Sequence, residues 1–226
     1  MPQLHLLRVF CAADNSAGNP LAVFLDGGEV PPPERQGVAA DLGLSETVFV
    51  DDQARGELRI FTPATEFPFA GHPTVGTAWL LAELGKPVEV LRVPAGEVLV
   101  RRANGDTFVR ARPEWAPPFE LERLVSAADV ESLDGPPGGR DLVAAWAWLD
   151  EAAGAVCSRV FLDRHGVPED EATGAAAVML CAELGRPLEI RQGHGSRLLA
   201  RPSDDGFVEV GGRTVLDEVT EYSLGS

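Results

Sequence analysis

The chain contains an internal repeat whose two copies are offset by 100 residues without a gap. Residues 82–87 read AELGKP and residues 182–187 read AELGRP, and residues 59–61 (RIF) align with residues 159–161 (RVF). A protein with two similar halves tends to place a ligand site where they meet. Reactive residues that differ between the copies are therefore the first candidates for such a site.

The charge and the cysteine usage exclude several classes of protein. The 226 residues include 35 acidic and 19 basic ones, for a net charge of −16, which argues against nucleic acids and anionic membranes as partners. No apolar run of about 18 residues predicts a membrane span, and the N-terminus lacks the features of a signal peptide. The three cysteines lie far apart without metal-ligand spacing. We therefore expect a cytoplasmic protein, because free cysteines are typical of reducing compartments.

Hydrophobic periodicity and turn residues predict the elements of the first half. We expect a short helix over 33–42, a hairpin of strands 46–50 and 57–61, and a longer helix over 73–84 that ends at Gly85. Further strands are predicted at 5–10, 21–25, 88–93, 97–101 and 107–111.

The second half is predicted to have the same order of elements. Its central helix, 174–184, is apolar on all sides, which is typical of a buried helix. The alanines of 141–156 (DLVAAWAWLDEAAGAV) favour a helix, but the repeat aligns this segment with the first hairpin. We therefore predict strands over 142–149 and 155–162 around a turn at 153–154. Strands are predicted to follow the helix at 188–191, 196–200 and 206–210.

These elements predict an α+β fold with two pseudo-symmetric halves, residues 1–112 and 113–226. Each half is expected to be a barrel-like, mostly antiparallel sheet around one central helix, joined through the proline-rich segment 112–120. Burial of the helix would offset the entropy cost of ordering each half. Residues 113–141 leave little room for strands, so the second half is expected to be shortened and open. The last strand is free to return to the first half.

Both central helices begin at a glycine-containing loop, with Gly71 in AGHPT and Gly174 in ATGA. The unpaired N–H groups and the dipole of a helix start attract anions, and glycine allows a ligand to approach the backbone closely. We expect the two helix starts to face one another across a cleft. They would there bind a small anionic metabolite, despite the acidic surface of the protein.

Glu46, His72 and Asp170 are reactive residues that the two copies do not share, and at an offset of 100 residues Glu46 aligns with Trp146. Two carboxylates and an imidazole in one site can move a proton to and from carbon. Each residue also has a simpler interpretation. Glu46 would be a solvated residue, His72 a packing or capping residue, and Asp170 an N-cap.

Several motifs resemble the phenazine-biosynthesis PhzF-like family of isomerases and epimerases, which shares the diaminopimelate-epimerase fold. They are DNSAGNPLAVF, LSETVFV, LRIFTPATEFPFAGHPTVGTAWLL and GVPEDEATGAAA, and the likeness runs from about residue 4 to about residue 215. The resemblance implies two similar α/β halves, each with a sheet around a central helix. It also suggests a homodimer. Since no nucleotide-binding loop, flavin signature or metal-ligand spacing is present, we expect no organic cofactor and no catalytic metal.

The resemblance assigns roles residue by residue. Glu46 of LSET matches the acid/base that shuttles a proton between carbons, and His72 and Asp170 match the other reactive residues of the cleft. The residues expected to bind the substrate are Asn19, Ser45, Gly71, Thr173, Gly174 and Ala175.

The chain departs from the family pattern at two positions. PEDEATGA stands where the family usually has PEDPATGS, so Ala175 lacks a hydroxyl and Glu171 is expected to add a negative charge beside the anion site. Neither helix start carries the cysteine that diaminopimelate epimerase and proline racemase use, which argues against racemisation by two thiols. The sequence is therefore consistent with three functions: an isomerase, an epimerase or racemase at a carbon next to a carboxylate, and a catalytically silent metabolite-binding homologue.

Overall fold

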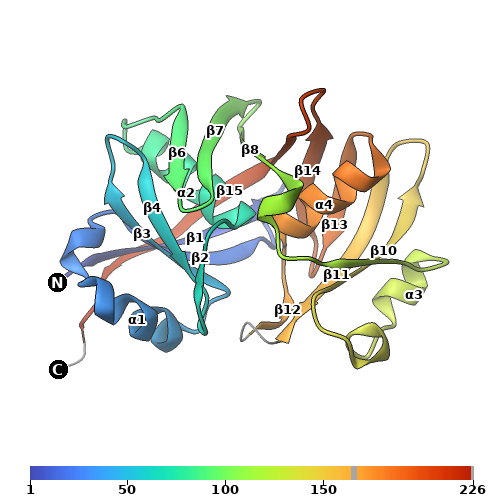
Figure 1. Ribbon diagram of the computed structural model, residues 1–226, viewed down its shortest axis with the longest axis horizontal. Coiled ribbons are helices and arrows are strands. Elements are labelled where there is room, and N and C mark those ends of the chain that lie inside the picture. Colours follow the sequence, from blue (N-terminus) through green and yellow to red (C-terminus); the bar gives the residue numbers. More distant parts are fainter. Residues whose placement is uncertain (164–166, 225–226) are drawn as a thin grey trace.

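The protein consists of two similar halves that lie side by side (Figure 1). The computed structural model describes residues 1–163 and 167–224. The first half is a closed eight-stranded barrel around helix α2 (Gly71–Glu83), and the second is an open sheet around helix α4 (Gly174–Leu184). This architecture confirms the predicted α+β fold with pseudo-symmetric halves and a shortened second half.

The barrel of the first half is closed by the last strand of the chain. Its strands, in order, are β1 (Gln3–Cys11), β2 (Asn19–Phe24), β3 (Glu46–Asp52), β4 (Glu57–Phe61), β6 (Val90–Val93), β7 (Gly96–Ala103), β8 (Asp106–Ala111) and β15 (Val208–Glu221). The short β5 (Glu66–Phe67) pairs with β4 and leads into α2. Helix α1 (Arg35–Leu42) packs outside the barrel and ends at Gly43, whose φ of 63° gives the left-handed cap.

The second sheet is shorter and has a free edge. Its strands, in order from β15, are β14 (Ser196–Pro202), β13 (Leu188–Gln192), β11 (Ala155–Leu162), β10 (Val143–Asp150) and β9 (Glu120–Arg123). Strand β12 (Val167–Asp170) pairs with β11. Helix α3 (Ala127–Glu131) packs on the outer face of β10 and β11 through Val130, Ala147 and Cys157. Within the described part of the chain β9 pairs with β10 alone, so the sheet does not close.

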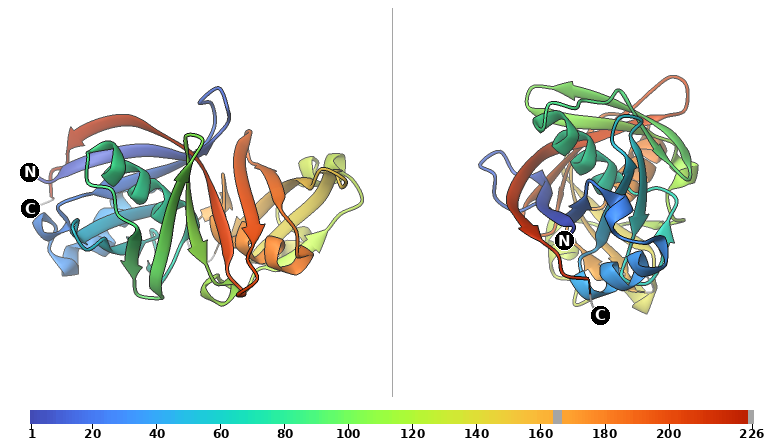
Figure 2. Two further views of the ribbon diagram at one scale, coloured as in Figure 1. Left: turned by 90° about the horizontal axis from the view of Figure 1, so that it is seen from above. Right: turned by 90° about the vertical axis from the view of Figure 1, so that its left-hand side faces the viewer.

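Strand β15 belongs to both halves, as Figure 2 shows. Residues 208–212 lie between β8 and β14, and residues 213–221 continue into an antiparallel pairing with β1. The predicted strand 206–210 was too short because Gly211 and Gly212 resemble the end of a strand. Glycine is needed there for close packing: a Cβ atom on Gly211 would lie 2.3 Å from the Thr107 carbonyl oxygen on β8.

The repeat contains an insertion that the sequence alignment does not show. Thr47 and Phe61 pair across the first hairpin and are 14 residues apart, whereas Val143 and Phe161 pair across the second and are 18 apart. The second hairpin is therefore longer by 4 residues. When Phe161 is matched to Phe61, the counterpart of Glu46 becomes Leu142, and its predicted alignment with Trp146 was wrong.

The repeated AELGKP and AELGRP segments connect each central helix to its own hairpin. Gly85 and Gly185 end the helices with φ angles of 74° and 61°. The next side chain then reaches the hairpin turn: Lys86 Nζ donates to Gln53 Oε1 (2.8 Å), and Arg186 Nη2 donates to the Ala152 carbonyl (3.1 Å). The part of the sequence that repeats most clearly therefore stabilises the fold of each half.

Other differences from the predicted elements are local. Helix α2 begins at Gly71, two residues before Pro73, and β9, β12 and α3 were not predicted. No helix within residues 1–163 and 167–224 has the length and apolarity that a membrane crossing requires.

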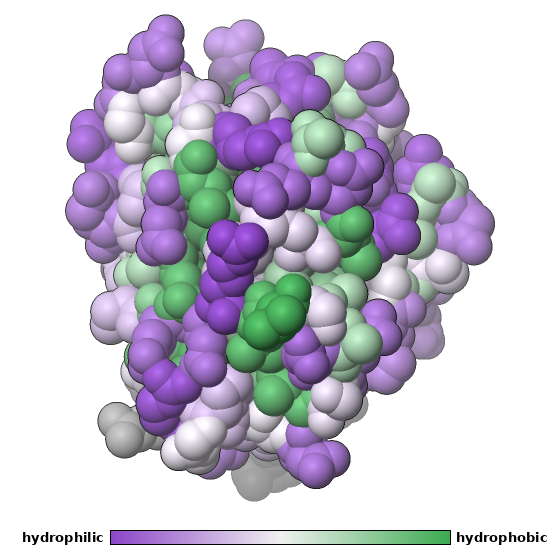
Figure 3. Space-filling view, turned by 90° about the vertical axis from the view of Figure 1, so that its right-hand side faces the viewer, coloured by the Kyte–Doolittle hydropathy of each residue, from purple (hydrophilic) through white to green (hydrophobic). Residues whose placement is uncertain are grey.

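The surface at the far end of the second half alternates between hydrophilic and apolar areas (Figure 3). Val125 is fully exposed at 100% and Leu149 is exposed at 42%. Isolated apolar side chains are common on protein surfaces and do not identify an interface. The homodimer suggested by the resemblance therefore stays a prediction.

Candidate functional site

The two central helices begin in direct contact. A Cβ atom on Gly71 would lie 2.6 Å from the Gly174 Cα, and a Cβ atom on Gly174 would lie 2.8 Å from the Gly71 Cα. These distances are far below an ordinary carbon–carbon contact, so only glycine fits at either position. The helix starts therefore face each other as expected, but they touch instead of flanking an open cleft.

The N–H groups of both helix starts remain available to an anion. Neither α2 nor α4 has a side-chain cap from any residue that the structure describes. Thr173 occupies the N-cap position of α4, where threonine usually binds its own helix, but its hydroxyl donates instead to Asp170 Oδ2 (2.6 Å). The Thr74 hydroxyl donates backward to the carbonyls of Ala70 (3.0 Å) and Gly71 (2.8 Å).

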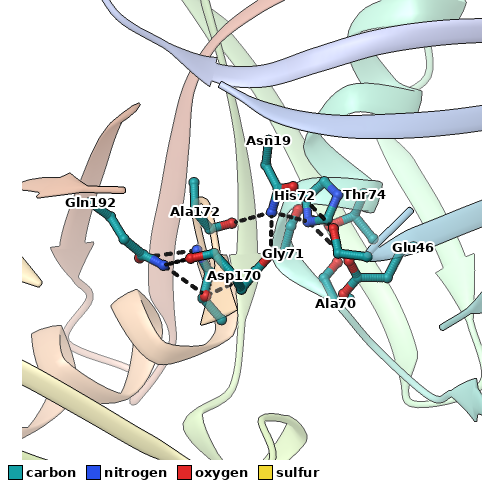
Figure 4. Close-up of polar contacts among 11 residues, drawn as sticks. Asn19, Glu46, Ala70, Gly71, His72, Thr74, Asp170, Ala172 and Gln192 are labelled. Atoms are coloured by element: carbon teal, nitrogen blue, oxygen red, sulfur yellow. Dashed lines mark hydrogen bonds and ion pairs between the residues drawn. The ribbon is translucent and has the colours of Figure 1, made fainter. Parts of the chain in front are cut away.

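Asp170 is held by residues from both halves (Figure 4). Asn19 Nδ2, from β2, donates to Asp170 Oδ1 (2.7 Å) and to the Ala172 carbonyl (2.9 Å). Gln192 Nε2 donates to the Asp170 carbonyl (2.8 Å), and Gln192 Oε1 accepts from the Thr173 N–H (3.1 Å). Burial raises the pKa of Asp170, while the hydrogen bonds from Thr173 and Asn19 oppose that rise. These hydrogen bonds favour the ionised form of the carboxyl group.

Glu46, at the start of β3, lacks comparable support. It is 6% exposed, and its Oε2 atom has no hydrogen-bond partner among the described residues. Burial, followed by repulsion from Asp170, raises the pKa of Glu46 well above its ordinary value, and the nearby Ser45 hydroxyl only partly opposes this. Glu46 is therefore protonated more readily than an ordinary glutamate. Burial raises the pKa of both carboxyl groups, but only Asp170 has several hydrogen-bond donors that oppose the rise.

His72, in the first turn of α2, is a neutral residue at physiological pH. Burial lowers its pKa to about 3. Its Nδ1 atom lies 3.4 Å from Glu46 Oε2 and 3.4 Å from Asn19 Nδ2. The contact with Glu46 has the length of an ion pair, but we interpret it as a contact between two uncharged groups because both pKa shifts favour the neutral forms.

The space between these groups is small and has one apolar side. It measures about 20 Å³, which is about the room that one water molecule needs. Glu46, His72, Asp170 and the helix starts form its polar side. The apolar side consists of Phe67, Phe69, Pro117, Phe119 and Leu162. A metabolite therefore does not fit this space unless its lining rearranges.

The structure brings all the predicted site residues together. Glu46, Gly71, His72, Asp170, Thr173, Gly174 and Ala175 line the small cavity. Asn19 and Ser45 lie just behind it, where the Ser45 hydroxyl donates to Asn19 Oδ1 (3.0 Å). The sequence did not predict Gln192, because no local pattern indicates that a buried glutamine hydrogen-bonds the backbone at the start of a neighbouring helix.

One expectation about this site was wrong. Glu171 does not line the cavity, because its carboxylate binds His194 and Ser196, and its charge acts on the site only from outside, through Asp170. Across residues 1–163 and 167–224, no group of three or more His, Cys, Asp and Glu side chains could hold a metal ion.

Comparisons with known proteins place this geometry in context. The family model for "Phenazine biosynthesis-like protein" (PhzC-PhzF) matches residues 8–146. The chain is 31% identical to a trans-2,3-dihydro-3-hydroxyanthranilate isomerase of Pseudomonas fluorescens, in an alignment that covers 78% of this chain and 80% of that protein.

Two solved structures are similar over nearly the whole chain. A PhzF-family protein from Enterococcus faecalis superposes with a TM-score of 0.80 at 22% identity, covering 99% of both chains. A protein described as a predicted epimerase, from Pseudomonas aeruginosa, superposes with a TM-score of 0.74 at 25% identity, covering 100% of both chains.

Proposed function

Because the chain belongs to the phenazine biosynthesis-like (PhzC-PhzF) family, we propose that it is an isomerase that moves a proton between two carbons of a small metabolite bearing a carboxylate. The observation that carries this proposal is the buried pair of Glu46 and Asp170: burial raises the pKa of both, and the pKa of Glu46, which also faces the charge of Asp170, is raised well above its ordinary value. A carboxyl group with a raised pKa, held in a water-poor site, can both give and accept a proton, which is what such a transfer needs.

Glu46 is the group that exchanges protons with carbon. It delivers its proton to one carbon, and the carboxylate so formed accepts a proton from another carbon, so the composition of the metabolite and its electron count do not change. Asp170 accepts hydrogen bonds from Asn19 and Thr173, and its negative charge adds to burial in raising the pKa of Glu46, which keeps the Glu46 proton transferable. His72 is neutral, so its contact with Glu46 adds no positive charge that would lower the pKa of Glu46.

The uncapped starts of α2 and α4 bind the carboxylate of the metabolite. Their free N–H groups and their dipoles supply positive potential without a basic side chain. The same groups stabilise negative charge that develops on the metabolite when a proton leaves carbon. No metal or organic cofactor takes part in this scheme.

The first substrate to test is trans-2,3-dihydro-3-hydroxyanthranilate, the compound named for the relative in Pseudomonas fluorescens. The purified protein is incubated with it in deuterated water, and the products are followed by NMR. Deuterium at a new carbon of a rearranged product supports the isomerase. Deuterium at the original carbon, with inversion, indicates the epimerase that the Pseudomonas aeruginosa neighbour suggests. Binding without any deuterium uptake, for this compound and for related carboxylates, indicates a silent homologue and contradicts the proposal.

Glu46→Gln tests the residue that carries the mechanism. It keeps the size of the side chain but removes the transferable proton, so we expect kcat to fall by about 10²- to 10⁴-fold with little change in affinity. Glu66→Gln is the matched control, because Glu66 is a partly exposed glutamate on β5 that pairs with Arg59. Equal activity of the two variants would show that Glu46 does not move the proton.

A further inference from the structure

Glu171 immediately follows Asp170, and its carboxylate is fully engaged outside the cavity. Glu171 Oε1 accepts from the His194 N–H (2.9 Å) and from the Ser196 hydroxyl (2.7 Å), and Oε2 lies 2.7 Å from His194 Nδ1. The Glu171 side chain is only 18% exposed. Hydrogen bonds to a charged acceptor are about twice as strong as neutral ones. The turn between β13 and β14 is therefore anchored to the loop that carries Asp170.

Ser196 extends this anchor into the first half. Its side chain is completely buried, at 0% exposure, and its hydroxyl accepts from the Gly18 N–H (2.9 Å) while donating to Glu171. Gly18 and Ser196 are 178 residues apart in the chain. One hydroxyl thus joins the carboxylate of Glu171 to the backbone of the loop between β1 and β2.

Asn19 directly follows Gly18 in the chain, so it connects the hydrogen bond of Ser196 to Asp170 in the site. Only glycine fits at this position: its φ is 95°, and a Cβ atom there would lie 2.6 Å from Cys11 Sγ. Asn19 is 1% exposed and donates both to Asp170 and to the Ala172 carbonyl. A displacement of Gly18 would therefore move the amide that supports Asp170.

We propose that Glu171 is a positioning residue which, through Ser196 and Gly18, fixes Asn19 against Asp170 across the contact between the two halves. The hydrogen bonds form a closed ring, because Glu171 follows Asp170 at the end of β12 and Gly18 precedes Asn19 at the start of β2. Its consequence for turnover rests on the proposed function, but the link itself does not. The glutamate that replaces the usual proline of this motif would then fix the position of the two halves relative to each other at the site.

The first test needs no substrate and uses NMR of the whole protein. Ser196→Ala removes the bridging hydroxyl, and Glu171→Ala removes its charged acceptor. We expect the Gly18 amide to exchange with solvent about 2- to 12-fold faster in both variants, which is the effect of losing one ordinary hydrogen bond. The side-chain amide resonances of Asn19 should shift as well.

Two control variants separate this link from general damage. Glu169→Ala removes the carboxylate on the other side of Asp170, which pairs with Arg159 and does not contact Ser196. His194→Ala removes a ring that is 95% exposed but keeps the backbone N–H that Glu171 accepts. In both controls, the exchange rate of the Gly18 amide and the side-chain amide resonances of Asn19 should equal those of the wild type. Wild-type exchange in Ser196→Ala and Glu171→Ala, or equal changes in the controls, would overturn the proposal.

The second test measures turnover once a substrate is in hand. We expect kcat to fall by about 10- to 100-fold in Ser196→Ala and Glu171→Ala, since small displacements of a positioned group cost about that much. The ionisable groups around Asp170 are Glu46, His72 and Glu171, and the charge of Glu171 raises the pKa of Asp170. The acid limb of the pH profile of kcat should therefore move to lower pH in Glu171→Ala and stay at the wild-type pH in Ser196→Ala.

The outcomes of the two tests distinguish this proposal from the proposed function. Altered Gly18 and Asn19 signals with unchanged kcat would overturn the positioning role. A wild-type protein without proton-transfer activity would contradict the proposed isomerase, and the NMR comparison would still decide whether Glu171 fixes Asn19.

Discussion

Substitution of Gly71 by alanine tests whether the contact between the two helix starts is structurally required. The added Cβ would lie 2.6 Å from the Gly174 Cα, whereas ordinary contacts begin at 3.4 Å, so the helix starts must separate by about 0.8 Å. The neighbour is backbone, which cannot rotate away. Overpacking of this kind costs about 1–3 kcal/mol, and the better helix propensity of alanine returns at most about 1 kcal/mol. We expect a net loss of about 1–2 kcal/mol in the free energy of unfolding.

Urea denaturation of Gly71→Ala beside Gly37→Ala measures this loss. Gly37 lies on the exposed face of α1 with open space around it, so alanine there should raise the free energy of unfolding by about 0.5–1 kcal/mol. The separation of the helix starts should also lower the rate with substrate by about 10²-fold, because it displaces the groups that bind the carboxylate. If Gly71→Ala were as stable as Gly37→Ala, and its crystal structure kept Gly174 in place, the close contact would not be a real constraint.

Three further predictions concern stability. The folded pKa of Glu46 lies above its ordinary value of 4.5, so the wild type loses stability as the pH rises from about 4.5 through the folded pKa. Glu46→Gln should remove this loss. Thermal unfolding at pH 8 should therefore show that the variant is more stable than the wild type. The folded pKa of His72 is about 3, against an ordinary 6.5, so the free energy of unfolding falls as the pH falls through that range. In His72→Gln the melting temperature should depend less on pH over this range. Ser126 and Asp129 form a capping box at the start of α3, and Ser126→Ala should cost about 0.5–2 kcal/mol in urea denaturation.

The halves and their helix starts could be predicted because their signals are local. Gly71 and Gly174 are the first residues of strongly apolar helices, and Gly85 and Gly185 follow their last turns. The alanine-rich segment that forms β10 could be assigned as a strand only by comparison with its repeat. Its own composition favours a helix, and pairing with β11 overrides that preference.

The remaining features depend on contacts that no single segment specifies. Strand β9 is only four residues long and forms because Glu120 N–H donates to the Leu142 carbonyl (2.7 Å) on a distant segment. The insertion in the second hairpin becomes visible only in the pairing of Val143 with Phe161. In the site, Gln192 on β13 hydrogen-bonds the Asp170 carbonyl, and Ser196 on β14 hydrogen-bonds the Glu171 carboxylate. Both contacts depend on the position of these strands beside the start of α4. These are tertiary effects, and sequence periodicity does not record them.

The path of β15 has a consequence for how the protein is made. During synthesis, the strands from β1 to β8 leave the ribosome long before residues 208–221, which supply the eighth strand of their barrel. Gln3 pairs with Glu221, more than 200 residues away, so the first barrel cannot close until residues 208–221 have been translated. Contacts so distant in sequence slow folding, and an unclosed barrel exposes strand edges that favour association with other chains. A nascent chain that stops before residue 208 therefore lacks the strand that joins β8 to β1.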